Sequence, residues 1–95
     1  MQTVESTTTV SLLLLEDDDG LREEIRVYLE REGVRVTAMA DGAEGLRAAL
    51  VGGFDAIVLD IGLPGMSGRE VCRRLREAGC FMPVLMLTGR TQERD

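Results

Sequence analysis

Two apolar segments that each run into acidic residues constrain the fold most strongly. Residues 10–15 lead directly into four consecutive acids at 16–19, and residues 54–59 end at Asp60. A continuous apolar run is typical of a strand covered on both faces, as in a parallel sheet. Parallel neighbouring strands would bring their carboxyl ends to the edge where open α/β sheets bind ligands. We therefore expect the acids to share one crevice that is suited to a hard cation.

Strand and helix signals alternate along the rest of the chain. Further strands are expected at residues 34–38 and 83–87, and helices at about 19–32 and from the capping residues Asp41 and Ser67 onward. The apolar stripes expected to face the sheet are Leu21, Ile25, Tyr28 and Leu29, then Leu46, Ala49 and Leu50, then Val71, Cys72, Leu75 and Ala78. The order β-α-β-α-β-α-β predicts a single α/β domain with right-handed crossovers.

The first strand-to-helix turn decides between the α/β folds. A dinucleotide-binding fold needs glycines there, and a phosphate-binding P-loop needs a lysine, whereas this chain has acids at the turn and arginine as its sole basic residue. The sequence therefore predicts a flavodoxin-like sheet with strand order 2-1-3-4, whose switch point lies between the first and third strands.

Composition limits the setting and the partners. A net charge of −6 argues against direct contact with nucleic acid. We expect Cys72 and Cys80 to be reduced structural thiols, since no histidine or third cysteine is present to complete a zinc site. Residues 1–9 are expected to form a flexible leader rather than a signal peptide, and the apolar runs are too short to span a bilayer, which predicts a cytoplasmic protein with no membrane contact.

The acids at 16–19 have two interpretations. On their own they would be the solvated start of a helix, where negative charge complements the helix dipole. Asp60 favours a metal site, because converging carboxylates raise one another's pKa unless a cation neutralises them. Carboxylates together with waters and a phosphate are the usual ligands of Mg²⁺.

Five spaced motifs resemble the receiver domains of two-component response regulators. They lie at residues 14–18, 40–46, 54–60, 63–68 and 83–88. The resemblance covers about residues 10–88 and is specific because all five motifs occur in order.

The resemblance implies a role for each candidate site residue. Asp60 would be the phosphoacceptor, Glu16 and Asp17 would help it bind Mg²⁺, Gly62 would offer its backbone carbonyl to the metal, and Thr88 would contact the phosphoryl group. The donor would be a histidine kinase or a phosphotransfer protein, since this chain has no histidine. Such a domain is not an enzyme beyond catalysing transfer to and from its own aspartate.

Several features of the family pattern are missing, which leaves alternatives open. The family's lysine at the end of a fifth strand, that strand itself and the last helices are missing, so residues 10–95 are expected to form a truncated receiver domain. The chain would be a fragment of a longer regulator, which we favour, or a short form. The alternative function is a phosphorylation-deficient pseudo-receiver that acts as an interaction module. We also hypothesise that the exposed last strand forms a homodimer contact.

Overall fold

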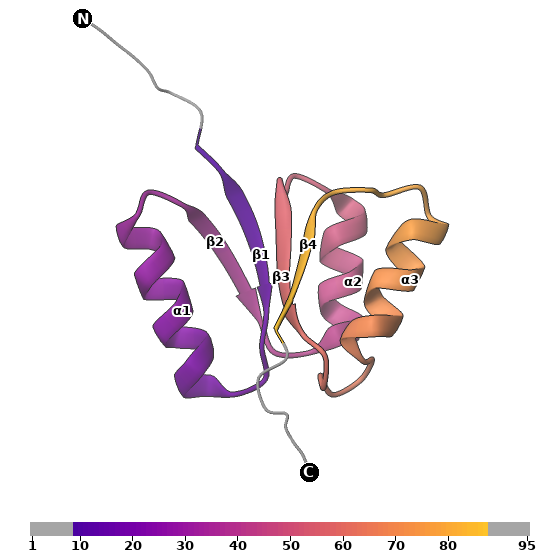
Figure 1. Cartoon of the computed structure of the whole chain (residues 1–95), viewed down its shortest axis with the longest axis horizontal. Coiled ribbons are helices and arrows are strands. Elements are labelled where there is room, and N and C mark those ends of the chain that lie inside the picture. The colour runs from indigo at the N-terminus through magenta and orange to yellow at the C-terminus, as the bar shows by residue number, and fades with distance from the viewer. Residues whose placement is uncertain (1–8, 88–95) are drawn as a thin grey trace, which may run out of the picture.

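The computed structural model describes residues 9–87, which alternate regularly between strands and helices. The elements are β1 (Ser11–Leu15), α1 (Asp19–Arg31), β2 (Arg35–Met39), α2 (Gly42–Val51), β3 (Ala56–Asp60), α3 (Gly68–Glu77) and β4 (Val84–Leu87). The strands form one parallel sheet in the order β2-β1-β3-β4, as the sequence predicts. The arrows of Figure 1 all run toward the lower end of the molecule, where the carboxyl ends of the strands meet.

The sheet is the middle layer of the described domain. Helix α1 lies on one of its faces, and α2 and α3 lie side by side on the other (Figure 1). Alternate residues of a strand point to opposite faces, and Leu13, Leu15, Ile57 and Leu59 are fully buried on the side of α2 and α3. The core cluster on this side consists of Leu13, Leu15, Leu46, Ala49, Ile57, Leu59, Leu63, Val71 and Leu75. Most of the hydrophobic stabilisation therefore comes from one face.

The register of β1 and β3 sets the position of the acids. Leu15 is paired with Leu59, so the next residues along the two strands, Glu16 and Asp60, reach the same level. The backbone N–H of Glu16 also donates to the carbonyl of Met39 at 3.0 Å, which extends the ladder to β2 one step beyond Leu15. Pairing alone thus brings two acids that are distant in sequence to one edge of the sheet.

The expected caps of the second and third helices are present, with different details. Asp41 accepts from the N–H of Ala43 at 3.4 Å, and Ser67 accepts from the N–H of Glu70 at 3.2 Å. The spacing of Ser67 and Glu70 in the sequence is that of a capping box, in which Glu70 would accept from the backbone N–H of Ser67. Its carboxylate instead pairs with arginines of α3, because a charged guanidinium one turn away is the stronger partner.

The predicted apolar stripes were partly wrong. Leu21 and Tyr28 of α1 are 42% and 62% exposed, Leu50 of α2 is 48% exposed, and Ala78 is exposed at the C-cap of α3. No residue of α1 is fully buried. The reason is architectural: within residues 9–87 no other helix lies on the face of α1, so the flanks of its apolar stripe remain open to water.

Other expectations meet the described residues only in part. Cys72 and Cys80 are free and half-buried. Within residues 9–87, no helix has both the length and the apolar character needed to span a membrane. Strand β4 lies at one edge of the sheet and its Leu85 is 61% exposed. Pairing with a second copy through this edge stays a prediction.

Candidate metal centre

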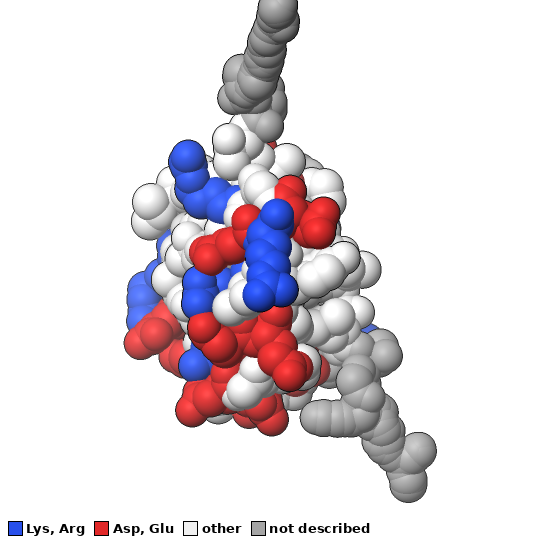
Figure 2. Space-filling model, turned by 90° about the vertical axis from the view of Figure 1, so that its left-hand side faces the viewer, with Lys and Arg blue, Asp and Glu red and all other residues white. Residues whose placement is uncertain are grey.

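Three carboxylates from the ends of two strands converge at the carboxyl end of the sheet. Glu16 and Asp17 follow β1, and Asp60 is the last residue of β3. One oxygen from each of the three lies within 4.8 Å of the others. Figure 2 shows the acidic side chains gathered toward this lower end of the molecule on the α1 side. The convergence that the two apolar strands predicted is therefore present.

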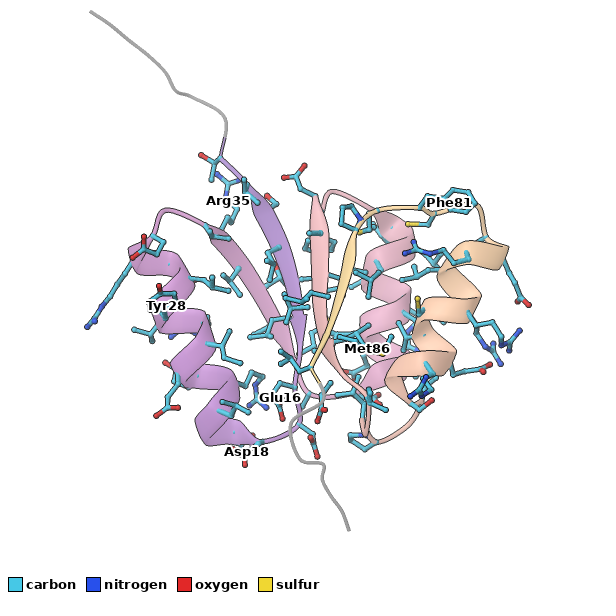
Figure 3. The ribbon with its side chains drawn as sticks, viewed as in Figure 1. Glu16, Asp18, Tyr28, Arg35, Phe81 and Met86 are labelled. Atoms are coloured by element: carbon cyan, nitrogen blue, oxygen red, sulfur yellow. The ribbon has the colours of Figure 1, made fainter. Side chains whose placement is uncertain are left out.

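Glu16 is the buried member of the cluster, with 3% of its surface exposed. Its Oε2 atom accepts from the backbone N–H of Asp18 at 3.0 Å, and Figure 3 shows Glu16 at the end of β1 beside Asp18 at the start of α1. Burial raises the pKa of Glu16 above its ordinary value, and the nearby charges of Asp60 and Asp17 raise it further, against the lowering effect of the Asp18 N–H. The charged form of Glu16 is thus less favourable than that of a free glutamate, and a bound cation would compensate this cost.

The turn after Asp60 is held by close backbone packing. The N–H of Gly68, the first residue of α3, donates to the carbonyl of Ile61 at 2.7 Å. A Cβ atom at position 68 would lie 2.4 Å from the carbonyl oxygen of Asp60, so a side chain there would displace the turn. The N–H of Gly42 donates to the carbonyl of Pro64 at 3.0 Å and ties the same loop to α2. The backbone that carries Asp60 is therefore fixed from two helices.

Gly62 and Thr88 are the two remaining candidates for the site. Gly62 lies in the exposed turn two residues beyond Asp60, and a Cβ atom there would meet nothing within 4 Å. A backbone carbonyl from this turn is compatible with a ligand role, which stays a prediction. Thr88 lies outside the described residues.

The four acids after β1 divide between the two interpretations. Glu16 and Asp17 join the metal-type cluster, whereas Asp18 and Asp19 serve the start of α1. Asp18 caps the helix by accepting from the N–H of Leu21 at 2.9 Å, and Asp19 pairs with Arg22 at 2.7 Å. Arg22 also donates to the backbone carbonyl of Glu16 at 3.0 Å, a contact that sequence reasoning missed. A basic residue one turn into a helix gives no signal of which carbonyl it will reach.

The donor set fits a hard divalent cation. Carboxylate oxygens are the ligands that Mg²⁺ and Ca²⁺ prefer, whereas soft metals select thiolates, and neither cysteine belongs to the cluster. A site that offers few protein ligands and leaves room for waters and a phosphate favours Mg²⁺, because Ca²⁺ takes more protein oxygens. The cluster could therefore hold a metal ion, and its carboxylates suit Mg²⁺.

Comparison with known proteins identifies the sequence pattern. A family model described as the response regulator receiver domain matches residues 12–95. The transcriptional regulatory protein AfsQ1 of Streptomyces coelicolor is 45% identical over 85 residues, which are 90% of this chain and 37% of AfsQ1. The chain thus spans a little over a third of the length of this curated relative.

Solved structures share the fold. The chemotaxis response regulator CheY4 of Vibrio cholerae superimposes with a TM-score of 0.82 at 33% identity, over 90% of this chain and 72% of CheY4. The response regulator TrrA of Thermotoga maritima, solved with Mg²⁺ and BeF, matches with a TM-score of 0.81 at 29% identity, over 87% of this chain and 72% of TrrA. TrrA has also been solved in complex with the histidine kinase ThkA, with a TM-score of 0.80 at 29% identity, over 92% of this chain and 75% of that chain.

Proposed function

The chain belongs to the response regulator receiver domains of two-component signalling, and we propose that Asp60 is its phosphoacceptor while Glu16, Asp17 and Asp60 hold Mg²⁺. The observation that carries the proposal is the convergence of these three carboxylates within 4.8 Å at the carboxyl end of the sheet. Asp60 is the member best suited to nucleophilic attack, because it is half-buried at a strand end and its backbone is fixed by Gly68.

The chemistry follows from the properties of a carboxylate. One oxygen of Asp60 attacks the phosphorus atom in line with the bond to the donor, and an acyl phosphate forms. With a phosphohistidine donor, the phosphorus–nitrogen bond breaks, its electron pair stays on the imidazole, and that nitrogen takes up a proton. Mg²⁺, when bound, supplies positive charge to the equatorial phosphoryl oxygens.

The other residues of the site orient and neutralise. Glu16 and Asp17 contribute the negative charge that holds the cation beside Asp60, and the backbone carbonyl of Gly62 adds an uncharged oxygen. Thr88, outside the described residues, would donate its hydroxyl to the phosphoryl group. These roles are proposals, supported by the donor set and by the complex of TrrA with Mg²⁺ and BeF.

A histidine kinase or a phosphotransfer protein is the proposed partner. The complex of TrrA with the histidine kinase ThkA supports it, and this chain has no histidine that could serve as its own donor. AfsQ1 is a transcriptional regulatory protein, but the part it shares with this chain is 37% of its length. The regulatory role of AfsQ1 is therefore not assigned to this chain. The absence of direct nucleic-acid contact stays a prediction for this domain.

Phosphorylation by a small donor tests the proposal directly. The protein is incubated with acetyl phosphate and Mg²⁺, and the covalent adduct is measured by intact mass. We expect an adduct on the wild type that needs Mg²⁺ and disappears in Asp60→Asn.

Asp55→Asn is the matched control for the loss of a carboxylate. Asp55 directly precedes the opposite end of β3 and accepts from the N–H of Ser11 at 2.8 Å, a bond that an asparagine oxygen can keep. This variant should be phosphorylated like the wild type. An adduct that survives Asp60→Asn would place the phosphoacceptor elsewhere. The absence of any adduct on the wild type would favour an interaction module without phosphotransfer.

A further inference from the structure

We propose that Arg22 is a positioning residue that holds the Glu16–Asp17 turn in the conformation that binds the metal. The inference rests on the proposed function of that site. Arg22 lies in the first turn of α1, where its N–H donates to the carbonyl of Asp18 at 2.8 Å. Its guanidinium reaches back over the turn, with Nη1 donating to the carbonyl of Glu16 at 3.0 Å and Nη2 to the carboxylate of Asp19 at 2.7 Å.

The contacts of Arg22 differ from those of the other paired arginines. Arg26 and Arg73 bind acids of their own helices at spacings of three and four residues, contacts that add little to stability at an exposed surface. Arg22 has the least exposed side chain among the paired arginines, at 23%. Among the basic side chains of residues 9–87, Arg22 is the one that hydrogen-bonds to a member of the acidic cluster, Glu16.

Glu16 is held at three points, and Arg22 supplies the third. The N–H of Glu16 binds β2 through Met39, its carboxylate accepts from Asp18, and its carbonyl accepts from Arg22. A buried carbonyl that loses its donor carries the cost of desolvation without compensation, so the turn would rotate toward water. Such a rotation would move the neighbouring carboxylate of Asp17 relative to Asp60.

Charge and positioning predict opposite effects of removing Arg22. A guanidinium near the cluster repels a cation, so electrostatics alone predicts tighter Mg²⁺ binding once the charge is gone. Loss of the bond to Glu16 predicts weaker binding, because partners that orient metal ligands typically contribute a factor of about ten or more in affinity. We infer that positioning outweighs charge, since the guanidinium is already neutralised by Asp19.

Calorimetric titration with MgCl₂ separates the two effects in four proteins: wild type, Arg22→Gln, Arg22→Lys and Arg26→Gln. Arg22→Gln should bind Mg²⁺ about tenfold more weakly. Arg22→Lys should fall between it and the wild type, since lysine keeps the charge and one donor but not the fork. Arg26→Gln, which removes the same charge from the same helix, should bind like the wild type. Unchanged or tighter binding by Arg22→Gln would overturn the inference.

Amide hydrogen exchange in the absence of metal provides a second measurement. The N–H of Asp18, which donates to Glu16, should exchange faster in Arg22→Gln than in the wild type, while Arg26→Gln leaves it unchanged. Equal exchange in all variants would refute the positioning role. If the wild type takes up no Mg²⁺, the proposed function fails. The exchange rate of the Asp18 N–H then still tests whether Arg22 holds the turn in place. If Arg22→Gln does not fold, Arg22→Lys carries both comparisons.

Discussion

Replacing Asp60 with asparagine should stabilise the metal-free protein. Asp60 lies among two other carboxylates, and like charges in one site repel each other unless a cation is bound. The substitution keeps the shape of the side chain and removes one charge. The gain should vanish when Mg²⁺ saturates the wild type.

The distance between the oxygens sets the magnitude. At 4.8 Å, two unit charges repel by about 0.9 kcal/mol in bulk water and by about 3.5 kcal/mol at an effective dielectric constant of 20. Asp17 is exposed and Asp60 is half-buried, so the lower part of this range applies. We expect Asp60→Asn to raise the free energy of unfolding by about 1–2 kcal/mol, which corresponds to roughly 4–15 °C in Tm for a domain of this size.

Asp60→Asn should also change how the free energy of unfolding depends on pH. The folded-state pKa of Glu16 lies above 4.5, so the folded protein binds this proton more tightly than the unfolded chain. The free energy of unfolding contributed by Glu16 is therefore highest below pH 4.5 and falls as the pH rises through the folded pKa. Because Asp60 is one of the charges that raise this pKa, the fall should be shallower in Asp60→Asn.

Thermal unfolding followed by circular dichroism, at low salt with a chelator and then with MgCl₂, measures these effects. Glu24→Gln is the control, because it removes one negative charge from the exposed surface of α1, away from the cluster. It should leave the Tm nearly unchanged, and Mg²⁺ should raise the Tm of the control and the wild type alike. The electrostatic reasoning would be refuted if metal-free Asp60→Asn had a lower Tm than the metal-free wild type. It would also be refuted if Mg²⁺ raised the Tm of this variant as much as that of the wild type.

Four further substitutions test the surroundings of the site. Gly68→Ala should destabilise the fold by about 1–3 kcal/mol through overlap with the Asp60 carbonyl, whereas Gly62→Ala, which meets no atom, should unfold at the wild-type denaturant midpoint. Ser67→Ala should cost about 1 kcal/mol in urea unfolding by removing the cap of α3. Arg73, with Arg74, lowers the pKa of Glu70 to about 2, so its stabilisation is present above pH 4.5 and lost toward pH 2. Glu70→Gln should therefore flatten acid unfolding over this range, and added salt should reduce the difference.

Local patterns in the sequence were sufficient for the architecture. The apolar runs before Glu16 and before Asp60, separated by helical periodicities, predicted a parallel sheet in the order that the structure shows. Handedness and crossover rules leave few arrangements for such an order, and the carboxyl ends of parallel strands must meet at one edge. The meeting of Glu16, Asp17 and Asp60 follows from these rules without knowledge of any individual contact.

Contacts between specific atoms were decided by the tertiary structure. Periodicity marked Tyr28 as core, but whether a helical stripe is covered depends on which other elements lie on that face, and Tyr28 is 62% exposed. The acids take different roles: Asp18 caps α1, whereas Glu16 accepts a hydrogen bond from Arg22. These roles depend on whether two groups come within hydrogen-bonding distance, and their spacing in the sequence does not determine this. Strand order follows from patterns repeated along the chain, whereas the partner of a single side chain is set by packing from all sides.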